Sequence, residues 1–325
     1  MRETRHGRCN GRVCALESVL DNILSTFAIV LIGWLMAKLR LFRQIGIDGV
    51  AQYVFGVAVP LLLFRLTAQA EIPAEIPWGF LLSYYLGALL VFVIGMLVAG
   101  GIFHNGLSHQ GAFGGAAAYS NTVLLGIPVV GGILGSEALV PLFVLIGVHG
   151  LIMVPLIVTV ISIGRRQGGT IGKVTKEIAG ELVHNPFIVA LVAGGLYGLY
   201  APPLPEPIDN VIATLADTAG PCALFALGGV LAQYPVTGGL KEAFAVSFVK
   251  LILHPAIVWV LATQVFDVQD SWVWVAVMLA AMPAGINVFV LAHRYEVASG
   301  GIGMSVVLST ALALVTLAVL IQFLP

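Results

Sequence analysis

Ten apolar runs, each about twenty residues long, constrain the fold of this chain more than any other feature. A helix of this length crosses the hydrocarbon core of a bilayer. Only 10% of the 325 residues are charged, whereas a soluble domain carries about 25%. The sequence therefore predicts an all-α polytopic membrane protein with ten transmembrane helices. The runs cover residues 19–39, 46–66, 78–103, 111–134, 138–163, 186–203, 208–233, 241–263, 271–293 and 301–324.

Two polar segments divide the chain. Residues 1–17 contain four arginines and are predicted to form an N-terminal tail, with a cleaved signal peptide as the alternative. Residues 164–184 form the least apolar connection and are predicted to be a cytoplasmic linker. This linker separates a first five-helix repeat, 18–163, from a second one, 185–325. Because five is an odd number, the two halves would enter the membrane from opposite sides.

The two halves also resemble each other in sequence. "FGVAVPLLLF" in the second span corresponds to "TAGPCALFAL" in the seventh, and "LLGIPVV" in the fourth to "LAAMPAGINVF" in the ninth. Pro60 and Pro221 are 161 residues apart, and Pro128 and Pro283 are 155 apart. Prolines that recur in matching helices at nearly one interval indicate an inverted repeat, which is typical of secondary transporters.

Prolines inside spans four and nine predict that both helices are broken. Proline has no N–H, so Pro128 and Pro283 each leave one backbone carbonyl without its helical partner. Gly126 and Gly285 lie beside them and would permit the backbone angles of a break. A break at membrane depth is tolerated where it is buried in protein or lines a wet cavity. Helices four and nine are therefore expected to cross at their prolines beside a central cavity.

Such a crossing would bring the positive ends of two half-helices to the membrane midplane, where they favour an anion such as a carboxylate. Asn121 and Asn287 are expected on the same face as these breaks and become candidate ligands of the anion, with packing between helices as the alternative. Thr122 is a candidate to line the cavity, unless its hydroxyl bonds its own backbone.

Ionisable residues deep inside spans are further functional candidates, because burying a charge in a membrane is costly. Asp217 lies four residues before Pro221, and Lys250 and His254 share one face of span eight. Asp217 and Lys250 are candidates for a buried ion pair, and Asp217 alone for a proton carrier. His149 is expected to bond a neighbouring carbonyl, with a proton site as the alternative. No set of residues has the spacing of a metal site.

The distribution of Lys and Arg predicts the orientation. Alternate connections collect nine basic residues on one side, and acidic residues dominate the other. The positive-inside rule makes the basic side cytoplasmic and leaves both termini outside, although the arginines of the tail argue the opposite way. The protein is thus expected in the plasma or inner membrane as a multi-pass protein in contact with lipid. No basic patch with aromatic residues points to nucleic acid.

The motifs around these positions resemble the auxin efflux carrier family. "NTVLLGIPVV" is similar to the fourth-helix signature of that family, and "AAMPAGINVFVLAHRYEV" to the ninth-helix signature. The resemblance covers almost the whole chain. It implies a ten-helix inverted-repeat fold, an elevator-like movement, and a substrate carboxylate held by Asn121 and the backbone around Pro128 and Pro283. It also implies a contribution of span two from around Val59 and Pro60. The central linker is far shorter than in many plant members, so phosphoregulation through a long loop is not implied. Ile286 and Asn287 depart from the plant pattern and put indole-sized specificity in doubt.

The predicted function is therefore secondary transport of a small organic anion, expected to be a carboxylate. Coupling to protons, to sodium or to the membrane potential alone is left open. The unit that contains the two broken helices is expected to move against a scaffold formed mainly by spans one, two, six and seven, and a homodimer formed through this scaffold is left open as well. The alternatives are a ligand-binding sensor without net transport and a sodium-coupled symporter of the bile-acid-carrier type. No nucleotide motif or other cofactor signature is present in the sequence, and no motif links its histidines and carboxylates into an enzyme site.

Overall fold

The computed structural model describes residues 11–69, 78–165, 186–234, 239–297 and 299–324. Every regular element in these ranges is a helix, and the only β-bridge among them joins Ser120 and Ala284. The α-helices are α1 (Gly11–Lys38), α2 (Gln44–Tyr53), α3 (Val59–Gln69), α4 (Trp78–Gly101), α5 (Leu107–Ala118), α6 (Ile127–Leu134), α7 (Leu139–Gly164), α9 (Pro186–Tyr200), α10 (Glu206–Asp217), α11 (Ala219–Leu231), α12 (Leu240–Phe248), α13 (His254–Val260), α14 (Asp270–Ala280), α15 (Ile286–Arg294) and α16 (Ser299–Leu320).

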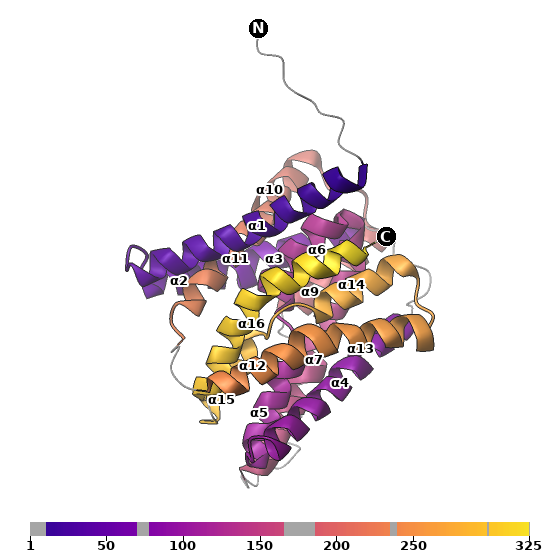
Figure 1. Ribbon diagram of the computed structural model, residues 1–325. Coiled ribbons are helices and arrows are strands. Elements are labelled where there is room, and N and C mark those ends of the chain that lie inside the picture. Colours follow the sequence, from indigo (N-terminus) through magenta and orange to yellow (C-terminus); the bar gives the residue numbers. More distant parts are fainter. Residues whose placement is uncertain (1–10, 70–77, 166–185, 235–238, 298, 325) are drawn as a thin grey trace.

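Short π-helical and 3-10 segments continue several of these helices. The π-helical segments are η1 (Val54–Ala58), η2 (Thr122–Gly126), η4 (Val249–Leu253) and η5 (Leu261–Val265), and the 3-10 segments are η3 (Ser136–Ala138) and η6 (Ile321–Phe323). In Figure 1, α1 and α10 lie at the top of the bundle, α4 and α5 at the bottom, and α7 and α16 between them.

The all-helical class and the membrane character of the chain are confirmed. Six of the predicted runs coincide with described helices that are long and apolar enough to cross a membrane. The other four contain shorter apolar helices, Leu24–Lys38, Thr122–Leu134, Val189–Tyr200 and Asp270–Ala280. Large apolar side chains such as Leu97 and Val265 lie on the surface, at 68% and 60% exposure, where lipid rather than water would cover them.

The predicted polar segments lie mostly outside the described residues. Of the tail, residues 11–17 already belong to α1, so this part is helical, and residues 1–10 are outside the described ranges. Of the linker, only 164–165 are described, at the end of α7.

The break predicted at Pro128 is misplaced. Pro128 lies near the start of α6, which continues directly from η2. A π-helical segment also precedes Pro60 and Pro255. The wider π-turn accommodates a proline ring and the missing N–H without ending the helix. In span four the helix stops earlier, and Tyr119–Asn121 are not helical.

Two pairs of helices approach closely through glycine. In the α1/α11 pair, a Cβ on Gly33 would lie 2.1 Å from the carbonyl oxygen of Phe225. In the α9/α3 pair, a Cβ on Gly194 would lie 2.4 Å from the carbonyl oxygen of Phe64. Any larger side chain would push these helices apart. Gly194 follows Gly33, and Phe225 follows Phe64, by the same 161 residues.

The buried apolar residues form two clusters. The smaller cluster draws its buried residues only from α4, α5 with Tyr119, α7, α12, η4, α15 with Val297, and α16. It contains no residue of α1, α2, α3, α9, α10 or α11. One part of the bundle thus has an apolar core of its own, separate from the helices that pack through Gly33 and Gly194.

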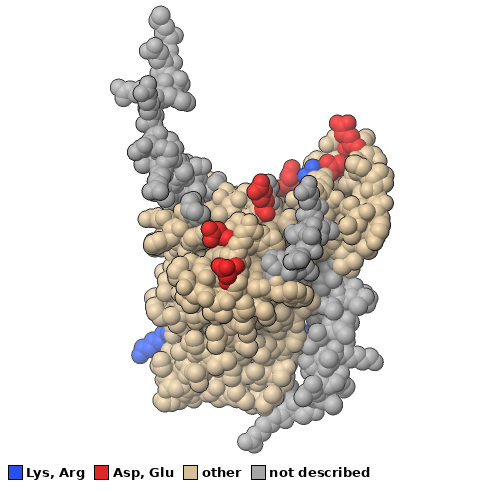
Figure 2. Space-filling model, turned by 90° about the vertical axis from the view of Figure 1, so that its right-hand side faces the viewer, with Lys and Arg blue, Asp and Glu red and all other residues tan. Residues whose placement is uncertain are grey.

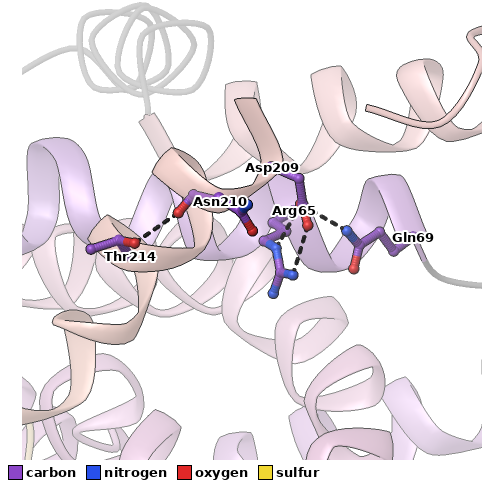
Figure 3. A network of polar contacts seen from close by, with 5 residues as sticks. All are labelled: Arg65, Gln69, Asp209, Asn210 and Thr214. Atoms are coloured by element: carbon purple, nitrogen blue, oxygen red, sulfur yellow. Dashed lines mark hydrogen bonds and ion pairs between the residues drawn. The ribbon is translucent and has the colours of Figure 1, made fainter. Parts of the chain in front are cut away.

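A polar network joins α3 to α10 at the other part of the bundle (Figure 3). Arg65 donates from Nε to Asp209 Oδ1 at 2.8 Å and from one terminal nitrogen to Oδ2 at 3.0 Å. Gln69 donates to Asp209 Oδ1 at 3.0 Å. This bidentate geometry fixes the relative position of the two helices.

Candidate functional site

Two non-helical segments cross near the centre of the described fold. The backbone N–H of Asn121 donates to the carbonyl of Pro283 at 2.9 Å, and the N–H of Gly285 donates to the carbonyl of Tyr119 at 2.9 Å. Together with the bridge between Ser120 and Ala284, these bonds join Tyr119–Asn121 to 283–285 as a short antiparallel pair. We call this pair the crossing. Backbone N–H and carbonyl groups that have no helical partner here thus bond each other across the crossing.

The glycines serve the crossing by their small size rather than by special backbone angles. Gly285 has φ −73° and ψ 142°, and Gly126 has φ −60° and ψ −48°, which are ordinary values for any residue. A Cβ on Gly285 would lie 2.5 Å from a ring carbon of Tyr119 and 3.2 Å from the carbonyl oxygen of Ser120. A Cβ on Gly126 would lie 3.0 Å from the end of the Leu279 side chain.

A cavity of about 530 Å³ lies against the crossing, within the usual range for small-molecule sites. The first turns of two helices line it: Thr122, Val123 and Leu124 of η2, and Ile286 and Asn287 of α15. Free N–H groups and the positive end of the helix dipole concentrate at such first turns. The cavity wall at the crossing therefore favours negative charge.

Asn121 provides a buried donor at this wall. It precedes η2, lines the cavity and is 6% exposed. Its Nδ2 has no hydrogen-bond partner among the described residues. A buried amide left unpaired costs about 1–3 kcal/mol, so a ligand or water that accepts from Nδ2 would be stabilising.

Aromatic and imidazole side chains hold the other polar groups of the cavity. Asn287 donates from Nδ2 to the Tyr119 hydroxyl at 3.0 Å. The Tyr119 ring packs on His149 with 4.5 Å between ring centroids. His149 accepts at Nε2 from the backbone N–H of Ser120 at 3.3 Å, which leaves the ring proton on Nδ1. Nδ1 is buried without a partner among the described residues and offers a second unpaired donor.

Lys250 contacts the crossing and is fully buried. Its Nζ lies 2.8 Å from Ser120 Oγ, 2.9 Å from His254 Nδ1 and 2.6 Å from the carbonyl oxygen of Ala280. Three acceptors match the three protons of an ammonium group. Tyr84 also donates to Ser120 Oγ, at 3.3 Å. Lys250 thus supports the crossing through three polar contacts, without an acidic partner in the described part of the chain.

Only some of the predicted residues meet at the cavity. Asn121, Thr122, Gly285 and Asn287 line it, Lys250 contacts the crossing, and His254 contacts Lys250. The residues that do not line it are Gly126, Pro128, Pro283, Val59 and Pro60. Pro283 contributes its carbonyl to the crossing. The ion pair between Asp217 and Lys250 is wrong, because Asp217 is exposed at the end of α10 while Lys250 contacts Ser120, His254 and Ala280.

Several residues that line the cavity were not among the predicted site residues. Span two contributes Asp48, Ala51 and Phe55 instead of Val59 and Pro60, and α11 with its following turn contributes Gln233 and Tyr234. His149 accepts from a backbone N–H rather than donating to a carbonyl. Local signals could not have shown this, since these residues meet only when α2, η1, α7 and α11 pack around one cavity.

Apolar helices that fit a membrane and a cavity lined by helix first turns are features of a transport protein. The "Membrane transport protein" family model matches residues 18–321. The chain therefore belongs to this family, which is that of the auxin efflux carriers, and it is a membrane transporter rather than an enzyme.

Three relatives are similar along nearly their whole length. One is a protein of Rhizobium meliloti named "Putative malonate transporter", 27% identical over 93% of this chain and 94% of its own length. Another is auxin efflux carrier component 8 of Arabidopsis thaliana, 23% identical over 91% of this chain and 96% of its own. The third is an "Uncharacterized transporter" of Methanothermobacter thermautotrophicus, 26% identical over 91% and 95%.

Proposed function

We propose that this transporter is a secondary active carrier that moves a small organic anion, a carboxylate, across the cytoplasmic membrane. The observation that carries this proposal is the cavity at the crossing, where two helix first turns and the unpaired amide of Asn121 face the same space. Donors arranged in this way bind a carboxylate through charge-assisted hydrogen bonds. The names of two relatives, which refer to malonate and auxin, agree with an acidic substrate.

Lys250 favours an anion over a sodium ion in the part of the cavity beside the crossing. Its ammonium bonds Ser120 of the crossing, so a cation bound beside it would meet a like charge. The fixed positive charge offers a partial counter-charge to the substrate without a coupling ion. The sodium-coupled alternative therefore has less support than movement driven by the membrane potential, which contributes about 2.3 kcal/mol per charge and 100 mV.

The ten-helix inverted repeat is part of the same proposal. Two intervals support it: the glycine contacts of Gly33 and Gly194 repeat after 161 residues, and the helices that follow the crossing begin at Thr122 and Ile286, 164 residues apart. Both intervals are close to the separation of Pro60 and Pro221. Pro128 and Pro283 do not correspond in this repeat, because only Pro283 lies at the crossing.

The smaller apolar cluster supports an elevator-type movement, which is part of the same proposal. The smaller cluster ties α4, α5, α7, α12, α15 and α16 into one unit that carries the crossing. The helices α1, α3, α9 and α11 would form the scaffold against which this unit slides. A homodimer through that scaffold remains part of the hypothesis.

The cavity faces the cytoplasm if the positive-inside rule holds. Two of its lining residues are close in sequence to the basic residues of a connection. Asp48 follows Arg43 by five residues, and Val290 precedes Arg294 by four. Acidic side chains gather toward one end of the face in Figure 2, as expected for the outer side. Both termini would then lie outside.

Substrate-dependent current in liposomes tests the proposal. On solid-supported membranes, addition of malonate, malate, lactate, pyruvate and indole-3-acetate in turn is expected to give a current for at least one acid. Asn121→Ala should weaken the apparent affinity for that acid about 10- to 100-fold, because it removes a hydrogen bond to a charged group. Binding of an acid without any flux of the same acid labelled with ¹⁴C would instead support the sensor. A current that Asn121→Ala leaves unchanged would remove the crossing from the site.

Tyr119→Phe tests how Asn287 is held. Loss of the hydroxyl leaves Asn287 Nδ2 without its partner, and we expect a rise of about two- to tenfold in the half-saturating concentration. Tyr85→Phe is the matched control, because the Tyr85 hydroxyl donates to the carbonyl of Leu145 and Tyr85 does not line the cavity. Equal effects of both variants would mean that the change is a general loss of packing.

A further inference from the structure

We infer that the cavity selects carboxylates with a single charge and an apolar body over dicarboxylates, and that Asp48 enforces this selection. The inference rests on the proposed function and concerns the same cavity. It starts from the arrangement of charge along the cavity wall.

The cavity has one polar end that favours an anion. There Asn121 and the first turns of η2 and α15 face the space, and Lys250 supports the crossing from a fully buried position. The described lining residues include no lysine or arginine. This end therefore offers donors for one carboxylate, with a single cation close by.

The walls beyond this end are mostly apolar. Phe55, Ile146, Leu151, Val154, Phe289 and Val290 line them. Such walls stabilise a hydrocarbon or aromatic body at about 25 cal/mol per Å² of apolar surface buried. A second carboxylate in contact with these apolar side chains would lose its hydration without gaining a donor from them. Gln233 and Tyr234 also line the cavity.

Asp48 is the only charged residue among the described lining residues. It is exposed, lies on α2 and accepts a hydrogen bond at Oδ1 from Gln44 Nε2 at 2.6 Å. The ion pairs within the described ranges, formed by Arg65, His109 and Arg165, do not include it. Its negative charge is therefore not compensated by a basic side chain of the described structure.

A dicarboxylate whose second carboxylate is at the far end of its body would meet this charge when its first carboxylate is bound at the crossing. Like charges at such a site repel each other, and the repulsion is larger where apolar walls reduce the dielectric constant. A substrate with one carboxylate and an apolar body avoids both costs. Malonate, a three-carbon dicarboxylate, would also leave most of the cavity without contacts.

Three probes of one shape test the inference. 3-Phenylpropanoate, 3-(4-carboxyphenyl)propanoate and 3-(4-(aminomethyl)phenyl)propanoate share the same phenylpropanoate skeleton, and the last two add a carboxylate or an aminomethyl group, charged as an ammonium, at the far end of the ring. Their apparent affinities are measured by competition against the acid that gives the largest current, and by thermal shift of the purified protein. We expect 3-phenylpropanoate to bind at least about tenfold more tightly than 3-(4-carboxyphenyl)propanoate, which is the ratio for about 1.4 kcal/mol.

Asp48→Asn keeps the size of the side chain and removes its charge. This variant should bring the two affinities within about threefold by improving the binding of 3-(4-carboxyphenyl)propanoate, with little change for 3-phenylpropanoate. Asp209→Asn is the matched control, because Asp209 bonds Arg65 away from the cavity, and it should preserve the wild-type preference.

The possible outcomes separate the inference from the proposed function. Equal affinity for the two acids in the wild type, or an unchanged preference in Asp48→Asn, would overturn the inference while transport of carboxylates stands. Tighter binding of 3-(4-(aminomethyl)phenyl)propanoate that is lost in Asp48→Asn would overturn it as well, since Asp48 would then hold an ammonium group. If no acid gave a current or a thermal shift, the proposed function itself would fail.

Discussion

Gly285→Ala is expected to abolish substrate-dependent current and to lower the melting temperature of the protein. The added methyl group would lie 2.5 Å from Tyr119 Cδ1 and 3.2 Å from the carbonyl oxygen of Ser120, so either the ring or the backbone has to move. The Tyr119 ring is buried, packs on His149 and holds Asn287. Its displacement would cost about 1–3 kcal/mol of stability by overpacking and would also disturb the donors that face the cavity.

Gly126→Ala provides the matched comparison. A methyl group there would lie 3.0 Å from the end of the Leu279 side chain and 3.4 Å, an ordinary contact distance, from the carbonyl oxygen of Asn121. The Leu279 side chain can turn where backbone cannot. We expect this variant to keep at least about half of the wild-type current and a melting temperature within about 4 °C. Thermal unfolding in detergent and current in liposomes measure both properties. If the two variants behave alike, close approach at Gly285 is not what maintains the crossing.

The helices of this fold could be predicted from the sequence, but the position of the crossing could not. Apolar runs of about twenty residues specify helices through composition alone, and each predicted run contains a described helix. Pro128 suggested a break that the π-turn of η2 absorbs. The segment Tyr119–Asn121 leaves the helix because 283–285 pairs with it, and this is a contact across more than 160 residues.

Candidate residues were predictable where a motif marked them. Asn121 and Asn287 lie beside the signature prolines in sequence, and both line the cavity. Asp48 and Tyr234 carry no local signal that distinguishes them from interfacial residues, and only the packing of α2, α11 and α15 brings them to one space. The pairing of Asp217 with Lys250 failed for the same reason, because the rotation of each helix about its axis is set by tertiary contacts.

Lys250→Gln is expected to weaken the apparent affinity for the transported acid by about thirtyfold. The substitution removes the charge but keeps a donor that can reach Ser120 or the carbonyl of Ala280. At a separation of about 8 Å and an effective dielectric constant of about 20, the lost attraction for a carboxylate is about 2 kcal/mol, which is about thirtyfold in affinity. Half-saturating concentrations from current measurements give this ratio directly.

Three comparisons distinguish this electrostatic role from a structural one. Lys38→Gln removes one charge from an exposed position at the end of α1, where salt screens it, and it should leave the affinity unchanged. Lys250→Arg retains the charge and should recover part of the loss if the larger group is accommodated. Melting temperatures show whether each variant is folded. A folded Lys250→Gln protein with wild-type affinity would mean that the substrate does not sense this ammonium group, and the anion preference would then depend on the helix first turns and Asn121 alone.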